Sequence, residues 1–386
     1  MTSPIVHFDP TNNKLVYNNV QKIDVKIFEQ YKDTEILDLS HGLFDDLPAE
    51  LANLKKLKVL FLSYGKIKKI STVVRKLESL QFLGARSCEI DAISEDCLPT
   101  NLKWITLTNN NLYSLPKSIG KLKKLQKLLL TKNKISFIPK EILQCQNLEL
   151  LRISLNNLIV SPLPMLSDLP SLSWYSDSSN LYNIDDNINK LKKYKTKDLS
   201  IISTIVDSPN SRVDRVLLNN TNAVLKIFKN EFVSDGSGTN EIMINSRLKG
   251  HPNLMAPLGY LEDQGKNING LIIEDLSNEY SPIASPPSFN TCTRDIYNGF
   301  SITKEAGQTI VKSIKDVCNH IHNLEIMHGD IYGHNIYLSS LSSQIKIGDF
   351  GAASIIPRNE IKIRRKIDIR ALNIFINEIN ACVLNE

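Results

Sequence analysis

The chain has 386 residues, of which 42% are hydrophobic and 23% charged, a balance that is typical of a globular protein and excludes wholesale disorder. The formal charge of +5 is too small to indicate a nucleic-acid-binding protein, which would need basic residues clustered on one face. No run of about 18 apolar residues predicts a membrane span. The segment Met1–Asp9 lacks the basic start and apolar core of a secretory signal peptide.

The six cysteines are scattered and form no CxxC pair, so the sequence predicts no structural zinc site. A reducing compartment suits such cysteines, and we predict a cytoplasmic protein. Export into another cell by a route without an N-terminal signal stays open. The cysteines are Cys88, Cys97, Cys145, Cys292, Cys318 and Cys382.

The first half of the chain repeats the pattern L-x-x-L-x-L-x-x-N-x-L six times, at spacings of 22 or 23 residues. A period of about 20–29 residues with this pattern is the signature of leucine-rich repeats. Each unit is predicted to form a short strand, a turn and a returning segment, and the inward apolar residues of successive units stack into one core. The registers begin at Thr34, Leu57, Leu80, Leu102, Leu125 and Leu148.

Asparagines recur at the turn of the later repeats, where an Asn side chain can satisfy backbone groups that no strand reaches. They are Asn110, Asn133 and Asn156, whereas Gly42, Gly65 and Cys88 stand at this place in the first three repeats. Residues 1–33 do not match the pattern and are predicted to form an N-terminal cap. The repeats are predicted over 34–180, with a C-terminal cap from about 162.

Strand residues beside the inward leucines are expected on the concave face of the horseshoe, because side chains alternate along a strand. Apolar residues dominate two stripes there, and Phe61, Phe82 and Trp104 are expected to form an exposed aromatic patch. Such a patch indicates contact with a protein partner or substrate; alternatively, another part of the same chain covers it. The predicted partner-binding residues are Val59, Phe61, Phe82, Trp104, Leu129 and Leu150.

A basic, polar stretch predicts a linker over 181–199, and a different order of elements begins at about 200. Strands are predicted over 213–218 and 223–228, joined by the turn Asn219–Asn222. A short helix over 240–249, two strands within 257–276 and an amphipathic helix over 303–324 follow.

Four motifs then appear in a fixed order. Lys226 lies on a predicted strand, and Glu241 on the next helix can pair with it. The loop His328–Asn335 places an Asp and an Asn five residues apart, and Asp349-Phe350-Gly351 follows the next strand. Each motif is weak alone, but this order on strand, helix, loop and strand is typical of protein kinases. His251-Pro-Asn and Asp368 fit the same pattern.

With the repeats in front, the chain resembles the leucine-rich-repeat protein kinases of bacteria. The resemblance implies an α/β solenoid, the horseshoe, followed by an α+β two-lobed protein-kinase-like domain with a truncated C-lobe. The domain is predicted over 200–386, with the N-lobe at about 200–276 and the C-lobe at 277–386. It implies ATP and Mg²⁺ as cofactors and protein Ser/Thr as acceptor.

The resemblance also assigns roles to individual residues. Asp330 is the expected catalytic residue, and Asn335 and Asp349 the expected metal ligands, because magnesium prefers oxygen donors. ATP binding is assigned to Lys226, Glu241, Ile273 and Glu274, and structural support to His328, Phe350, Gly351 and Asp368.

Three features depart from the kinase pattern. The segment Val206–Arg212, where a glycine-rich phosphate loop is expected, contains no glycine. Gly329 and Tyr332 replace the usual Arg and Lys of the catalytic loop. Only 19 residues separate Asp349 from Asp368, and no Ala-Pro-Glu motif lies between them.

Two alternatives to a Ser/Thr kinase therefore remain. The first is a pseudokinase scaffold whose repeats carry the interaction, and the second is a small-molecule kinase with the same fold. The sequence indicates no nucleic-acid partner, and it leaves the oligomeric state, the acceptor and the partner open.

Overall fold

The computed structural model describes residues 5–178, 190–230, 232, 235–248, 250–263 and 267–384. Residues 1–4 of the predicted N-terminal cap and 181–189 of the predicted linker lie outside these ranges. The chain divides into two compact units, Met1–Leu172 and Ser173–Glu386. The second unit therefore begins inside the stretch 162–180 that the sequence assigns to the C-terminal cap.

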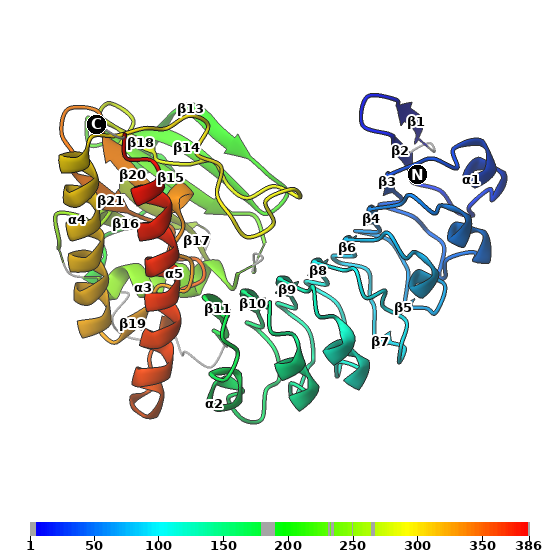
Figure 1. Cartoon of the computed structure of the whole chain (residues 1–386). Coiled ribbons are helices and arrows are strands. Elements are labelled where there is room, and N and C mark those ends of the chain that lie inside the picture. The colour runs from blue at the N-terminus through cyan, green and yellow to red at the C-terminus, as the bar shows by residue number, and fades with distance from the viewer. Residues whose placement is uncertain are drawn as a thin grey trace. The chain divides into compact units, whose positions relative to one another are not determined.

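The first unit is the predicted solenoid. A hairpin of β1 and β2 opens it, and one short parallel strand from each repeat follows, so that β2-β3-β4-β6-β8-β9-β10 lie side by side in this order (Figure 1). The strands are β1 (Ile5–Asp9), β2 (Lys14–Asn18), β3 (Ile36–Asp38), β4 (Val59–Phe61), β6 (Phe82–Gly84), β8 (Trp104–Thr106), β9 (Lys127–Leu129) and β10 (Leu150–Arg152), with the small parallel pair β5 (Lys69–Ile70) and β7 (Ala92–Ile93).

Short 3-10 helices return the chain on the opposite side of the repeats. They are η1 (Ala49–Asn53), η2 (Val74–Lys76), η3 (Lys117–Lys121) and η4 (Lys140–Gln144); α1 (Lys26–Gln30) precedes them and α2 (Leu163–Leu166) follows. All six residues that open the predicted registers are buried with no exposed surface. This confirms the periodicity, because the first residue of every register lies in the shared core.

The asparagine ladder is present as predicted. Asn110 accepts from the backbone N–H groups of Cys88 and Ile90 at 3.1 and 2.9 Å, and it donates to the carbonyls of Ala85 and Leu107. Asn133 and Asn156 repeat this arrangement one and two turns later. In the third repeat, the thiol of Cys88 donates to the carbonyl of Leu62 at 3.0 Å, so cysteine fulfils part of the same role.

The concave stripe differs from expectation, because its side chains are largely buried rather than exposed. Val59, Phe82, Leu129 and Leu150 are buried, and Phe61 and Trp104 are half-buried. The aromatic rings pack on one another. The Phe82 ring lies 5.2 Å from Phe61 and 5.1 Å from Trp104, and the Lys127 ammonium lies 4.0 Å above Trp104. Gly84 makes room for this stacking, since a Cβ there would lie 2.7 Å from the Phe82 ring.

The second unit contains the two lobes expected of a kinase domain. The N-lobe sheet has the strand order β12-β16-β17-β15-β14-β13, and α3 packs against it. Its elements are β12 (Lys193–Tyr194), η6 (Thr196–Asp198), β13 (Leu199–Asp207), β14 (Ser211–Leu218), β15 (Thr221–Phe228), α3 (Gly238–Arg247), β16 (Pro257–Asp263) and β17 (Asn267–Glu274). β12 falls within the predicted linker, yet it pairs with β16 and so belongs to this sheet.

In the described C-lobe, α4 and α5 run side by side (Figure 1), and two small sheets accompany them, the three-stranded β18-β20-β21 and the two-stranded β19-β22. Its elements are β18 (Tyr280–Pro282), α4 (Lys304–Asn323), β19 (Ile326–Met327), η7 (Gly333–Asn335), β20 (Ile336–Ser339), β21 (Ile345–Ile347), β22 (Ser354–Ile355), η8 (Arg358–Glu360) and α5 (Ile361–Ala381). The segment β11 (Trp174–Ser176) also belongs to this unit.

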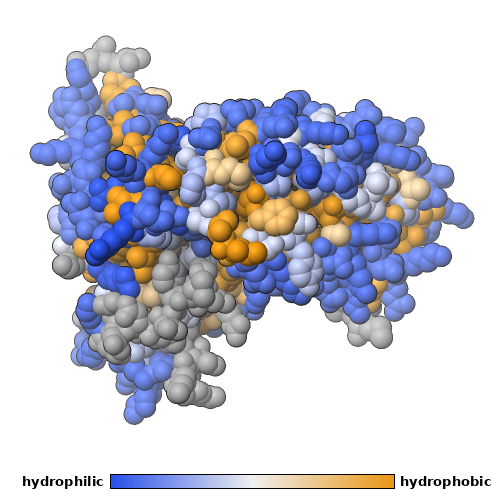
Figure 2. Space-filling view, turned by 90° about the horizontal axis from the view of Figure 1, so that it is seen from below, coloured by the Kyte–Doolittle hydropathy of each residue, from blue (hydrophilic) through white to orange (hydrophobic). Residues whose placement is uncertain are grey.

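The helices of the second unit follow from local sequence signals. Ser237 and Thr303 cap α3 and α4 by accepting backbone N–H groups three residues later. On α4, Ile310, Ile314 and Val317 recur at helical spacing and are buried, as predicted. Neither of the long helices in the described chain, α4 and α5, has a stretch apolar enough to cross a membrane. The face in Figure 2 is mainly hydrophilic, with apolar groups gathered toward its middle.

Candidate active site

The N-lobe part of the site is an ion cluster around Lys226 of β15. Its ammonium donates to both carboxylate oxygens of Glu241 on α3, at 2.8 and 2.9 Å, and to Oδ1 of Asp349 at 3.3 Å. Gly238 permits α3 to approach β15, because a Cβ there would lie 2.3 Å from the Phe228 ring. The sheet and the helix thus bring together the three charges that the sequence predicted.

Two carboxylates share this single ammonium, and their pKa values move in opposite directions. Burial raises the pKa of Glu241 to about 7, against the opposing effect of Lys226. Lys226 lowers the pKa of Asp349, whose side chain is 51% exposed. Burial alone would lower the pKa of Lys226, but Asp349 and Glu241 raise it above its ordinary value. With both carboxylates ionised, the cluster carries one excess negative charge and can accept a further cation.

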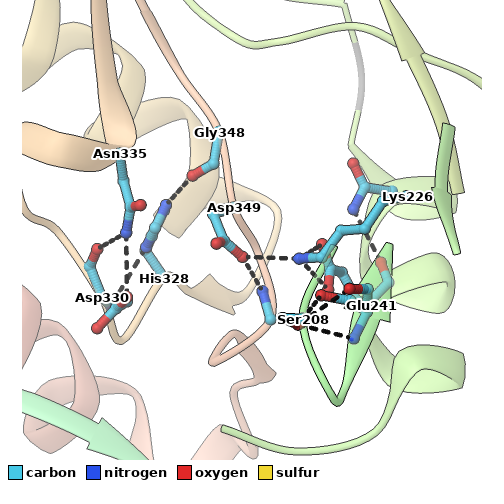
Figure 3. A network of polar contacts seen from close by, with 11 residues as sticks. Ser208, Lys226, Glu241, His328, Asp330, Asn335, Gly348 and Asp349 are labelled. Carbon is cyan, nitrogen blue, oxygen red and sulfur yellow. Dashed lines mark hydrogen bonds and ion pairs between the residues drawn. The ribbon is translucent and has the colours of Figure 1, made fainter. Parts of the chain in front are cut away.

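The predicted catalytic loop, His328–Asn335, lies on the other side of Asp349 (Figure 3). Asn335 donates from Nδ2 to the carbonyl and to Oδ2 of Asp330, both at 3.0 Å. This leaves the amide oxygen of Asn335 and one carboxylate oxygen of Asp330 outside the pair. The loop thus presents an oriented carboxylate beside a second oxygen donor, which is what a general base and a metal ligand require.

His328 connects this loop to the Asp349 segment. Its Nδ1 accepts the backbone N–H of Asp330 at 3.2 Å, so the proton resides on Nε2, which donates to the carbonyl of Gly348 at 3.1 Å. Burial lowers the pKa of His328 and keeps the ring neutral. The ring also contacts the buried Phe350, with centroids 4.7 Å apart.

Asp368 on α5 holds the start of the loop. One carboxylate oxygen accepts the backbone N–H of Gly329 at 2.9 Å, and the other accepts that of His328 at 2.8 Å and contacts Nε2 of His322 at 3.0 Å. Because Asp368 is buried, these hydrogen bonds replace the water that its charge would otherwise need. Asp368 therefore anchors the catalytic loop to α5.

The backbone of Asp349 is in the left-handed region, with φ at 52°. A non-glycine residue in this region is strained, and such strain concentrates at functional sites. Gly351 follows at the point of closest packing, where a Cβ would lie 3.2 Å from Oδ1 of Asp349 and 3.4 Å from Oε2 of Glu241. The tripeptide is thus shaped to present the Asp349 carboxylate to Lys226.

Two predicted ATP-binding residues have other side-chain partners. The Glu274 carboxylate accepts from Lys346 Nζ and from the backbone N–H of Ala256, both at 2.6 Å. Ile273 packs against the N-lobe core cluster. The role of Ile273 and Glu274 in ATP binding therefore stays a prediction.

The segment Val206–Arg212, where a phosphate loop is predicted, forms a turn whose hydrogen bonds are made within the turn. The Ser208 hydroxyl accepts the backbone N–H groups of Asn210 and Ser211, and the N–H of Ser208 donates to the Ser211 carbonyl. Pro209 has no N–H to offer. Every backbone N–H of this turn therefore already has an acceptor, so the turn lacks the free donors that a glycine-rich loop directs at phosphate.

The sequence did not predict a group of residues around the catalytic loop. Asp295 accepts from the backbone N–H of His334 and contacts its Nδ1 at 2.8 Å. Trp174 and Asp177, which the sequence assigned to the repeat cap, contact Tyr332 and Arg364. Gly329 in place of the usual Arg was the available signal, because another chain segment leaves no room for a side chain there: a Cβ would lie 2.5 Å from the Tyr175 carbonyl.

Comparisons with known proteins agree with both halves of the chain. The protein kinase domain family matches residues 210–367. The serine/threonine-protein kinase prpf4B of Dictyostelium discoideum is 24% identical over 209 residues, which cover 53% of this chain and 24% of that protein.

The repeats match other proteins. The leucine-rich repeat and calponin homology domain-containing protein 1 of Homo sapiens is 32% identical over 96 residues, which cover 25% of this chain and 13% of that protein. A solved leucine-rich-repeat protein of Leptospira interrogans is 36% identical, with a TM-score of 0.37 and coverage of 39% of each chain. This chain spans less than a quarter of the length of the two curated relatives. It joins N-terminal leucine-rich repeats to a C-terminal protein kinase domain, the architecture of a leucine-rich-repeat protein kinase.

Proposed function

We propose that the second unit transfers the γ-phosphoryl group of ATP to a hydroxyl of a protein Ser or Thr, and that the repeats bind a protein partner or the substrate. The observation that carries the proposal is the paired arrangement of Lys226 with Glu241 and Asp349, beside Asp330 with Asn335. Phosphoryl transfer depends on positioning and charge neutralisation, and these five residues supply both.

Each residue has a part in this reaction. Lys226, oriented by Glu241, binds the α- and β-phosphates of the nucleotide. Asp330, whose carboxylate is oriented by the hydrogen bond from Asn335, orients the acceptor hydroxyl and takes its proton. Neutral His328 fixes the direction of Asp330 through the backbone.

Mg²⁺ fits the chemistry of the site. Asp349 and Asn335 offer oxygen ligands, and the cluster carries excess negative charge when both Glu241 and Asp349 are ionised. Asp349 and Asn335 would hold the ion, which would supply positive charge to neutralise that of the phosphates.

The self-bonded turn at Ser208 favours the pseudokinase as a second candidate. Without free backbone donors in that turn, phosphate binding relies on Lys226 and the metal, and ATP affinity is lower than in a glycine-rich kinase. A small-molecule acceptor is a third candidate, which the short segment between Asp349 and Asp368 favours.

The test compares phosphate transfer by wild type, Asp330→Asn and the control Asp316→Asn, a 72% exposed carboxylate on α4. We expect Asp330→Asn to lower kcat by about 10²–10⁴-fold and the control to match wild type. Protein and small-alcohol acceptors are offered side by side. Equal transfer by Asp330→Asn and wild type contradicts the proposal. No thermal stabilisation of wild type by millimolar Mg·ATP favours the pseudokinase.

A further inference from the structure

A short segment before the N-lobe, Ser173–Ser178, is packed against the catalytic loop. Trp174 is 1% exposed, and its indole N–H donates to the carbonyl of Ile331 at 2.9 Å. Its ring stacks on Tyr332 with centroids 4.3 Å apart and planes 5° apart. The two residues that follow Asp330 are thus held by one tryptophan.

The same segment also holds the residue before Asp330. The carbonyl of Tyr175 comes so close to Gly329 that a Cβ there would lie 2.5 Å from it. This contact accounts for glycine at a place where kinases usually have arginine. Asp330 therefore lies between two positions, 329 and 331, that the segment contacts on either side.

A buried ion pair fixes the segment to α5. Both guanidinium NH₂ groups of Arg364 donate to the Asp177 carboxylate, at 2.8 and 2.7 Å, and the Tyr175 hydroxyl donates to it at 3.0 Å. Arg364 also donates to Ser354 Oγ at 3.0 Å, just beyond the Asp349 tripeptide. One helical turn further along α5, Asp368 anchors the catalytic loop.

In kinases regulated through their activation segment, a phosphate there pairs with arginine and orders the catalytic parts. Here the unmodified Asp177 already forms a bidentate pair with Arg364, the kind of pair that arginine also makes with phosphate. We propose that Ser173–Ser178 is a built-in positioning element, in which Asp177 on Arg364 and Trp174 on the catalytic loop replace activation-segment phosphorylation. Both are positioning residues, since Trp174 acts through Ile331 and Tyr332, and Asp177 acts through Arg364 and Tyr175.

The inference rests on the proposed kinase activity, so its test includes a readout that needs no catalysis. The full-length chain is compared as wild type, Asp177→Asn, Asp177→Glu and the exposed control Asp316→Asn. Amide hydrogen exchange is followed at residues 329–336 together with steady-state kinetics. Trp174→Phe, which keeps an aromatic ring but removes the N–H to Ile331, serves as a second variant if Asp177→Asn does not fold.

We expect Asp177→Asn and Trp174→Phe to speed exchange in residues 329–336 by about tenfold or more. We also expect kcat to fall by about 10–100-fold with KM for ATP changed less than about twofold, because positioning is lost rather than binding. Asp177→Glu restores most of kcat, and wild type treated with phosphatase keeps its activity.

Unchanged exchange at residues 329–336 in both variants overturns the inference, as does loss of wild-type activity after phosphatase. A lower melting temperature with unchanged kcat also overturns it, because that result indicates a merely structural role. If wild type transfers no phosphate but exchange rises in the variants, the proposed activity fails while the positioning contact stands.

Discussion

Substitution of Gly329 by Ala tests whether the Tyr175 carbonyl approaches the catalytic loop as described. Two effects add at this position. The backbone has φ of 74°, and a Cβ would lie 2.5 Å from the Tyr175 carbonyl and 3.0 Å from that of Ala352. Gly299 offers a matched control, because its φ is 76° and nothing lies within 4 Å of its Cβ position. Gly299→Ala thus has the conformational cost without the clash.

The magnitudes follow from these two positions. A left-handed backbone costs an alanine about 1 kcal/mol, and displacing close-packed neighbours costs a further ~1–3 kcal/mol. We therefore expect Gly329→Ala to lower the free energy of unfolding by about 2–4 kcal/mol and Gly299→Ala by about 1 kcal/mol. For a unit of this size, each 1 kcal/mol lowers Tm by about 2–4 °C.

Tryptophan fluorescence can isolate the second unit. The chain has two tryptophans, and Trp104 lies in the repeats. In a Trp104→Phe background, Trp174 is the remaining reporter, and its stacking on Tyr332 makes it sensitive to the catalytic loop. Urea and thermal unfolding of both alanine variants are then compared in this background. Equal losses for Gly329→Ala and Gly299→Ala would refute the close approach of Tyr175.

Three further predictions concern other parts of the chain. The raised pKa of Glu241, about 7 in the folded state, contributes stability at low pH that is lost as pH rises through 7. Wild type should therefore lose stability relative to Glu241→Gln between about pH 5 and 8, and parallel profiles would contradict the shift. Asn110→Ala removes the acceptor of the Cys88 and Ile90 N–H groups and the donor to the Ala85 carbonyl, whereas the Leu107 carbonyl keeps Asn133, and it should cost about 2–4 kcal/mol in urea unfolding. The half-buried neighbour Asn111→Ala should cost far less, and similar losses would argue against the ladder. Ser208→Gly frees two backbone N–H groups of the phosphate loop, so KM for ATP should fall about threefold or more; an unchanged KM would show that this turn does not limit affinity.

Much of the fold could be predicted because its signals are local or periodic. The repeat strands could be predicted because the pattern recurs every 22 or 23 residues, and the turn at Asn110 because an Asn there bonds nearby backbone groups. The site residues Lys226, Asp330 and Asp349 could be predicted because their types and order are set by phosphate and metal chemistry.

The role of Ser173–Ser178 could not be predicted in the same way. Its hydrogen bonds join residues 157 and 187 positions apart, from Trp174 to Ile331 and from Asp177 to Arg364. No periodicity in the sequence marks such contacts. Because Ser173–Ser178 follows the last repeat directly, the sequence assigned it to the repeat cap. The burial of the concave side chains could not be predicted from the sequence either, because the packing of Phe61, Phe82 and Trp104 depends on the room left by Gly84.

The boundary at Leu172–Ser173 has a consequence for how such chains can be rearranged. A recombination event that exchanged the repeat array for another at the start of the family match, residue 210, would discard Trp174 and Asp177. The transplanted domain would keep Arg364 with Glu360 but lose the bidentate Asp177 carboxylate, and removing these hydrogen bonds from a buried guanidinium is destabilising. We therefore expect exchanges that cut before Ser173 to preserve the stability of the second unit better than exchanges at residue 210.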